Sequence, residues 1–127
     1  MTRILLVEDS TDILFLLQTE LEWMDYSVDA ASDALTGLQL ARKNRPNIIV
    51  SDLHMPDIDG YEFIRRVRHT QELKGIPAIA LTGYSSDKEV KLALAAGFDA
   101  HLTKPVDGKT VSDMISRLLA KRLRKAS

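Results

Sequence analysis

The stretch Ile48-Ile49-Val50-Ser51-Asp52-Leu53-His54-Met55-Pro56-Asp57-Ile58-Asp59-Gly60 gives the clearest indication of the fold. It begins as a short apolar run, which is typical of a β-strand buried on both faces of a sheet. The run ends at the acid Asp52, and Met55-Pro56 and Asp59-Gly60 then mark a loop that leads into a helix. A carboxylate at the carboxyl end of a parallel strand lies where open α/β sheets place their sites. Taken alone, Asp52 could equally be a helix cap or a solvated loop acid.

A short apolar run followed by apolar residues at helical spacing recurs five times along the chain. Because helices of about a dozen residues separate the expected strands, the sheet should be parallel, with helices on both faces. The helices should start near residues 10, 33, 60, 86 and 107, mostly behind a capping Ser or Asp. The first helix should carry Ile13, Leu14, Leu17, Leu21 and Met24 on one apolar face. The expected strands are residues 4–7, 26–31, 48–52, 76–81 and 100–103.

The composition is ordinary for a globular protein and argues against several classes. The chain has 127 residues, 45% of them hydrophobic and 28% charged, which suits one domain with its own core. The formal net charge of −1 gives no overall field for nucleic acid, and the basic segment 121–125 is interpreted as a solvated helix end. There is no cysteine, and no apolar stretch approaches the roughly 20 residues of a membrane span. We expect a cytoplasmic protein without membrane insertion or direct contact with nucleic acid.

Residues with chemical function stand at the ends of four expected strands. Glu8-Asp9 follow the first strand, Asp52 ends the third, and Thr82 and Lys104 follow the fourth and fifth. Because the carboxyl ends of parallel strands meet at one edge, these residues should converge. Each pair of carboxylates about 4 Å apart repels by on the order of 4 kcal/mol at an effective dielectric of about 20. The cluster therefore needs cations: Lys104 supplies one charge, and an all-oxygen site with room for waters suits Mg²⁺.

The same set of residues could accept a phosphoryl group. A carboxylate nucleophile, Mg²⁺, an ammonium group and a hydroxyl are the parts needed to take up a phosphoryl group and hold its oxygens. Thr82 offers the hydroxyl, and Gly83 leaves space for a ligand to approach the backbone. Each residue alone is weak evidence, but one such residue at each strand end is a strong indication.

Four motifs are specific enough to suggest a family: Leu6-Val7-Glu8-Asp9, the run from Asp52 to Gly60, Leu81-Thr82-Gly83 and Lys104-Pro105. With them the chain resembles the response-regulator receiver family, which has the fold of the bacterial chemotaxis response regulator, over essentially all 127 residues. The resemblance implies a (βα)5 flavodoxin-like fold with strand order 2-1-3-4-5. It also implies one receiver domain over residues 1–127, with no output domain in this chain.

The resemblance implies a role for each matching residue at the acidic end of the site. Asp52 would be the phosphoaccepting aspartate. Glu8 and Asp9 would hold Mg²⁺ together with Asp52, and the backbone carbonyl of His54 would complete the protein ligands. Glu8-Asp9 replaces the commoner pair of aspartates, which keeps the charge and changes only the reach.

The remaining matches imply a switch. Thr82 would hydrogen-bond the phosphoryl group, Lys104 would pair with a phosphoryl oxygen, and a cis peptide would precede Pro105. His101 stands where the family usually carries Tyr or Phe as a moving ring, so the ring movement would fall to an imidazole. The rim of the site would be formed by Gly83, by Tyr84 and by the side chain of His54, where smaller or more polar residues are often found.

The function implied is that of a phosphoacceptor switch in a two-component relay. A histidine kinase or a histidine phosphotransfer protein would supply the phosphoryl group, and the face of the fourth helix, fifth strand and fifth helix would control binding of a downstream protein. Such a chain is a signalling domain, although it catalyses its own phosphorylation from phosphohistidine and its own slow dephosphorylation.

Two alternatives use the same residues differently. A phosphohydrolase of the haloacid dehalogenase type also has a strand-end aspartate and Mg²⁺, but its general acid two residues later is replaced here by His54. A receiver-like scaffold would bind a partner without phosphorylation, although every expected site residue is present. The chain could be a stand-alone regulator or a receiver from a hybrid kinase or larger regulator.

Overall fold

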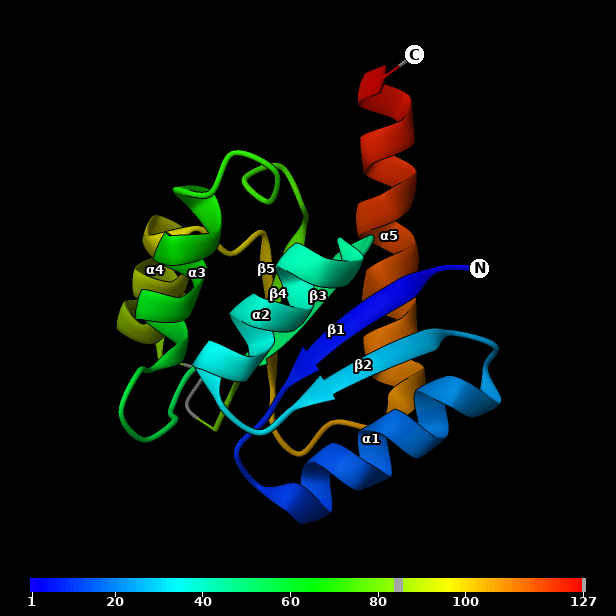
Figure 1. The fold of residues 1–127 in the computed structure, drawn as a ribbon, viewed down its shortest axis with the longest axis horizontal. Coiled ribbons are helices and arrows are strands. Elements are labelled where there is room, and N and C mark those ends of the chain that lie inside the picture. Colours follow the sequence, from blue (N-terminus) through cyan, green and yellow to red (C-terminus); the bar gives the residue numbers. More distant parts are fainter. Residues whose placement is uncertain (84–85, 127) are drawn as a thin grey trace.

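The computed structural model describes residues 1–83 and 86–126, which form a five-stranded sheet between two layers of helices (Figure 1). The strand order is β2-β1-β3-β4-β5, and each neighbouring pair runs parallel. Helices α1 and α5 cover one face of the sheet, and α2, α3 and α4 cover the other. The elements follow one another as β1 (Arg3–Val7), α1 (Thr11–Trp23), β2 (Ser27–Ala31), α2 (Ala34–Asn44), β3 (Ile48–Asp52), α3 (Gly60–Arg68), β4 (Ala78–Thr82), α4 (Asp87–Ala96), β5 (Ala100–Thr103) and α5 (Gly108–Ala126).

The predicted α/β class, the parallel sheet and the strand order are confirmed, and the element boundaries differ by one or two residues. The largest difference in a strand is at β4, which starts at Ala78 and not at residue 76. Pro77 has no N–H to donate to the ladder, although its carbonyl accepts the N–H of Ile49 at 2.9 Å. The same strand extends to Thr82, so the predicted functional threonine is the last residue of β4.

Side-chain caps fix where the helices begin. Ser10, Asp33, Asp59 and Ser86 each stand just before a helix and accept the backbone N–H three residues further on. Each cap satisfies one of the N–H groups that a helix start leaves without a partner. Asp107 does the same for α5 by accepting the N–H of Thr110 at 2.8 Å. The caps therefore hold the loops that leave the carboxyl ends of the strands.

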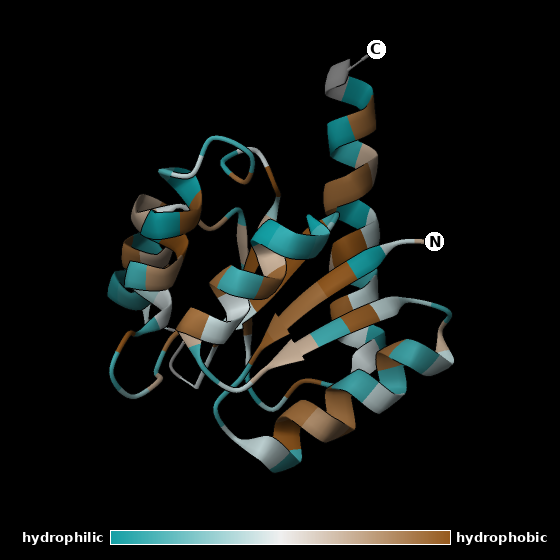
Figure 2. Cartoon of the chain, viewed as in Figure 1, coloured by the Kyte–Doolittle hydropathy of each residue, from teal (hydrophilic) through white to brown (hydrophobic). Residues whose placement is uncertain are grey.

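The core consists of two apolar clusters, one on each side of the sheet. In Figure 2 the hydrophobic colour is densest along β1, while hydrophilic residues cover much of the helices. The first helix departs from its predicted pattern. Leu17 and Leu21 are fully buried, but Ile13 and Met24 are 37% and 40% exposed. Ile13 lies in the first turn of α1 and Met24 is the residue that caps its end, so both stand at the ends of the helix, beyond the buried stripe of Leu17 and Leu21.

The described helices include none that combines the length and the apolar character needed to cross a membrane.

Candidate functional site

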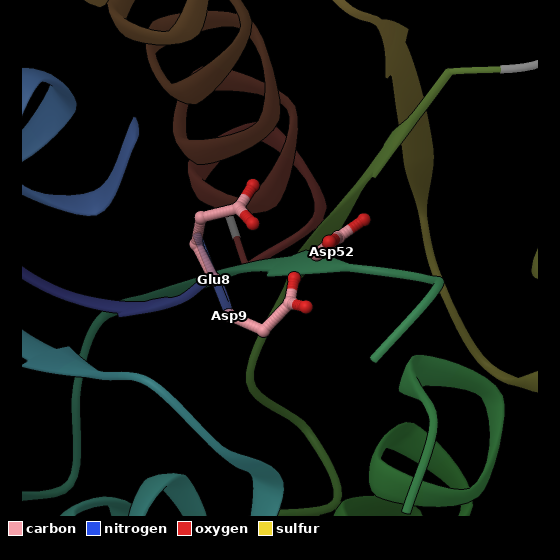
Figure 3. A group of neighbouring side chains, drawn as sticks. All are labelled: Glu8, Asp9 and Asp52. Carbon is pink, nitrogen blue, oxygen red and sulfur yellow. The ribbon is translucent and has the colours of Figure 1, made fainter. Parts of the chain in front are cut away.

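Three carboxylates meet where β1 and β3 end (Figure 3). Glu8 and Asp9 directly follow β1, Asp52 is the last residue of β3, and each offers an oxygen within 4.8 Å of the other two. The pairing of Val7 with Ser51 in the sheet brings these two strand ends level with one another. Glu8 and Asp52 are buried, with 0% and 4% of their surface exposed, whereas Asp9 is exposed. The structure therefore brings together the three acids that the sequence predicts to converge.

Glu8 is the most deeply enclosed of the three acids. Its Oε2 accepts the N–H of Ser10 at 3.0 Å, and its Oε1 lies 2.7 Å from Nζ of Lys104. Burial raises the pKa of Glu8 to about 7, although the contacts with Lys104 and Ser10 act in the opposite direction. A further cation in the site would therefore stabilise the charged form of this buried carboxylate.

Lys104 joins the acids from the end of β5. Its ammonium lies 2.7 Å from Oε1 of Glu8 and 3.2 Å from Oδ2 of Asp52. Partial burial lowers the pKa of Lys104, but these two carboxylates outweigh that effect and the pKa lies above its ordinary value. Its backbone N–H donates to the carbonyl of Thr82 at 2.7 Å, and the peptide bond to Pro105 is cis. Lys104 is therefore charged, and both its ammonium group and its backbone N–H are held in place.

The acidic cluster has the composition of a site for a hard divalent cation. Its donors are all carboxylate oxygens, which Mg²⁺ and Ca²⁺ prefer. Oε1 of Glu8 is buried and, among the described residues, has no hydrogen-bond donor in good geometry, so its partner is the Lys104 charge alone. Lys104 balances one of the three negative charges, which leaves a net negative pocket. The residues present therefore fit a bound metal ion.

Thr82 and His101 lie on neighbouring strands at the same edge. Thr82 is buried, with 1% of its surface exposed, and ends β4. His101 is partly buried on β5, beside Ala80 in the sheet register. Because side chains alternate along a strand and paired residues of parallel strands share a face, Thr82 and His101 lie on the same face of the sheet. That face is the one covered by α2, α3 and α4.

The rim residues are only partly described. Gly83 is exposed, and a Cβ built there would meet no atom within 4 Å, which agrees with the predicted open space beside Thr82. Tyr84 lies outside the described residues. The side chain of His54 is described and is 51% exposed.

Gly60 allows the start of α3 to lie against the end of β3. A Cβ added to Gly60 would stand 2.2 Å from the carbonyl oxygen of Asp52 and 2.7 Å from Cα of Leu53. The N–H of Gly60 also donates to the carbonyl of Leu53 at 2.9 Å. The start of α3 is thus packed directly on the end of β3, where only glycine fits.

The structure adds two residues that the sequence interpretation missed. Nε2 of His54 lies 2.8 Å from Oε1 of Glu89 in α4, and the Tyr61 hydroxyl donates to the same oxygen at 2.5 Å. The N–H of His54 donates to Oδ1 of Asp52 at 3.3 Å, so these residues adjoin the acidic cluster. No motif marks Glu89 or Tyr61, because they converge through packing of α3 on α4 and not through spacing in the sequence.

The comparisons with known proteins agree on one family. Residues 4–116 match the model of the response regulator receiver domain. Protein PilH of Pseudomonas aeruginosa is 32% identical over 120 residues, which cover 94% of this chain and 99% of PilH. The transcriptional regulatory protein AfsQ1 of Streptomyces coelicolor is 35% identical over 127 residues, which cover all of this chain and 55% of AfsQ1. The chain thus spans nearly all of one relative and about half of the other.

Solved structures give the same result. The chemotaxis response regulator CheY4 of Vibrio cholerae superimposes with a TM-score of 0.87 at 32% sequence identity. The superposition covers 92% of this chain and 98% of CheY4, so the likeness extends over nearly the whole of both chains.

Proposed function

This chain belongs to the response regulator receiver family of two-component systems, whose standard function is that of a phosphoacceptor switch, and on that premise we propose that Asp52 is the residue that accepts the phosphoryl group. The observation that supports this assignment is the position of the Asp52 carboxylate. It lies buried at the end of β3, with Lys104 at one oxygen and the His54 N–H at the other. Residues 1–127 would form one receiver domain.

The transfer would be a displacement at phosphorus. One oxygen of the Asp52 carboxylate attacks the phosphorus of a phosphohistidine, an O–P bond forms, and the P–N bond breaks with its electron pair returning to the imidazole. Lys104 would hold one phosphoryl oxygen and Thr82 would donate its hydroxyl to another. Thr82 ends β4, which pairs with β3, and Lys104 directly follows β5, which pairs with β4, so the sheet fixes their positions before the phosphoryl group arrives.

We propose Mg²⁺ as the metal ion and Glu8, Asp9, Asp52 and the backbone carbonyl of His54 as its protein ligands. When bound, Mg²⁺ supplies positive charge that draws the phosphoryl oxygens together with the carboxylates. The support is the all-oxygen donor set and the charge balance of the cluster, in which one lysine faces three acids.

The phosphodonor would be a histidine kinase or a histidine phosphotransfer protein that docks on α1. Ile13 and Leu16 are 37% and 58% exposed, and with Leu17 and the segment 104–106 they line an apolar depression of about 350 Å³. Figure 2 shows the hydrophobic colour across the first turns of α1. Lys104 belongs both to this depression and to the site, so a helix of the donor resting here would present its phosphohistidine to Asp52.

The two alternatives receive less support. The family match is to receiver domains and not to phosphohydrolases, and the side chain two residues after Asp52 is an imidazole bound to Glu89. A scaffold without phosphorylation would have no use for a buried carboxylate pair held against a lysine, an arrangement that costs folding free energy.

The direct test is labelling with acetyl phosphate in the presence of Mg²⁺. Wild-type protein should incorporate a base-labile phosphoryl group, and Asp52→Asn should fall to background. Asp57→Asn is the matched control, because Asp57 is an exposed acid in the same loop and Asn also tolerates its left-handed backbone (φ 67°). Equal labelling of the wild type and Asp52→Asn would refute the assignment.

A further inference from the structure

His54, Glu89 and Tyr61 form a polar cluster that joins three elements beside the acidic site. His54 belongs to the loop after β3, Tyr61 to the first turn of α3 and Glu89 to the first turn of α4. One oxygen of Glu89 accepts a hydrogen bond from the Tyr61 hydroxyl at 2.5 Å and lies 2.8 Å from Nε2 of His54. The two rings meet edge to face with their centroids 6.4 Å apart. The three side chains therefore contact one another across the loop after β3, α3 and α4.

The bonds within this cluster are of the stronger kind. The Glu89 side chain is only 17% exposed, so its carboxylate is poorly solvated and depends on these two donors. Burial, together with the hydrogen bond to Glu89, raises the pKa of Tyr61 well above its ordinary value, which keeps the hydroxyl protonated as a donor. Nε2 of His54 can donate a hydrogen bond from the neutral ring in its Nε2–H tautomer as well as from the charged ring.

His54 connects this cluster to the phosphoacceptor through its own backbone. Its N–H donates to Oδ1 of Asp52 at 3.3 Å, and its carbonyl is a proposed Mg²⁺ ligand. The side chain is 51% exposed, and its Nε2 lies 2.8 Å from Oε1 of Glu89. This contact restricts the imidazole and links the loop to α4.

We propose that Glu89 is a positioning residue for the phosphoacceptor site: by holding the imidazole of His54, it fixes the His54 N–H and carbonyl at Asp52. The role of Glu89 rests on the proposed role of Asp52 and adds a connection from the site to α4 that does not pass through Thr82. Because coupling between two sites is reciprocal, a partner that displaces the start of α4 should also weaken metal binding at Asp52.

The test measures Mg²⁺ binding and backbone protection in unphosphorylated protein. The variants are Glu89→Ala, Glu89→Gln and Asp87→Ala, and the readouts are the Mg²⁺ dissociation constant from amide shifts and the hydrogen-exchange rate of the His54 amide. Asp87 is the matched control, because it is an exposed acid in the same first turn of α4 and its loss removes the same charge. Urea unfolding of each variant separates loss of positioning from loss of stability.

Glu89→Ala should weaken Mg²⁺ binding about tenfold, at the low end of the effects seen when an outer partner of a metal ligand is lost. Exchange of the His54 amide should accelerate by a similar factor. Asp87→Ala should change Mg²⁺ affinity less than about twofold, because an exposed charge is screened by salt. Glu89→Gln keeps an oxygen acceptor for both donors and should recover most of the affinity.

A background of His54→Ala completes the test. Once the imidazole is absent, Glu89→Ala should have no further effect on Mg²⁺ affinity. Equal Mg²⁺ affinity and equal His54 amide exchange in the wild type and Glu89→Ala would overturn the proposal. An equal loss of Mg²⁺ affinity in Asp87→Ala and Glu89→Ala would also overturn it. Neither readout involves phosphorylation, so these outcomes are separate from failure of Asp52 to become labelled.

Discussion

Gly60 controls how closely α3 can approach the end of β3. Since a Cβ there would stand 2.2 Å from the Asp52 carbonyl, Gly60→Ala must push the helix start or the strand end aside. We expect a loss of about 2 kcal/mol in the free energy of unfolding, as for other overpacked sites, together with slower phosphorylation because Asp52 moves. Urea unfolding and acetyl phosphate labelling measure the two effects.

Gly83→Ala is the control for that substitution, because a Cβ at Gly83 meets open space. It should change unfolding by less than about 0.5 kcal/mol, as surface substitutions usually do. Similar destabilisation by the two substitutions would show that the close contact at Gly60 does not limit the site.

Glu8 makes the stability of the metal-free protein depend on pH. Its folded pKa of about 7 lies above the ordinary 4.5, so the folded state binds the proton more tightly than the unfolded state. Stability from this group is therefore present below about pH 4.5 and is lost as the pH rises through about 7. A shift of this size corresponds to on the order of 3 kcal/mol.

Glu8→Gln removes the titrating group and keeps the side-chain size. As the pH rises from about 5 to about 8, the wild type should lose on the order of 3 kcal/mol of unfolding free energy relative to Glu8→Gln. Urea unfolding without metal measures this difference. Saturating Mg²⁺ should abolish most of this pH dependence, because the cation takes the place of the proton. Parallel pH profiles for the two proteins would show that Glu8 titrates normally.

Helix α1 is the element on which we expect the phosphodonor to dock. Leu16→Glu places a charge in the apolar depression next to Lys104, and should slow transfer from a phosphorylated histidine phosphotransfer protein roughly tenfold or more. Labelling by acetyl phosphate, which needs no protein docking, should stay unchanged. Trp23→Glu is the control: Trp23 is 84% exposed on the same helix, at the end remote from the site. A loss of labelling with both donors would locate the defect in the site itself.

The face of α4, β5 and α5 should respond to phosphorylation. Thr82 and His101 share a face of the sheet, so inward movement of the Thr82 hydroxyl toward a phosphoryl group would free space for the imidazole. Addition of beryllofluoride with Mg²⁺ should shift backbone amide signals chiefly within residues 82–106. Shifts confined to the neighbourhood of Asp52 would show that Asp52 is not coupled to the face of α4, β5 and α5.

At the scale of the whole molecule, the parallel α/β sheet and the acidic cluster could be predicted from local patterns, whereas the strand order was implied by the family resemblance. Five alternations of strand and helix require a parallel sheet, and a parallel sheet brings Glu8, Asp52 and Lys104 to one edge. The contacts of Glu89 and Tyr61 could not be predicted, because they depend on how α3 packs against α4. The exposure of Ile13 could not be predicted for a related reason. Apolar residues repeated every 3.6 positions indicate an apolar helix face, but they do not show how much of that face is buried.

The central claim, that Asp52 carries the phosphoryl group, is tested most directly by locating the modified residue. Borohydride reduces an acyl phosphate and converts the aspartyl residue into homoserine, which mass spectrometry of a peptide digest can locate. After phosphorylation with acetyl phosphate and Mg²⁺, we expect homoserine at position 52 and at no other acid. Homoserine at position 9 or 57, or its absence from a protein that has become labelled, would contradict it.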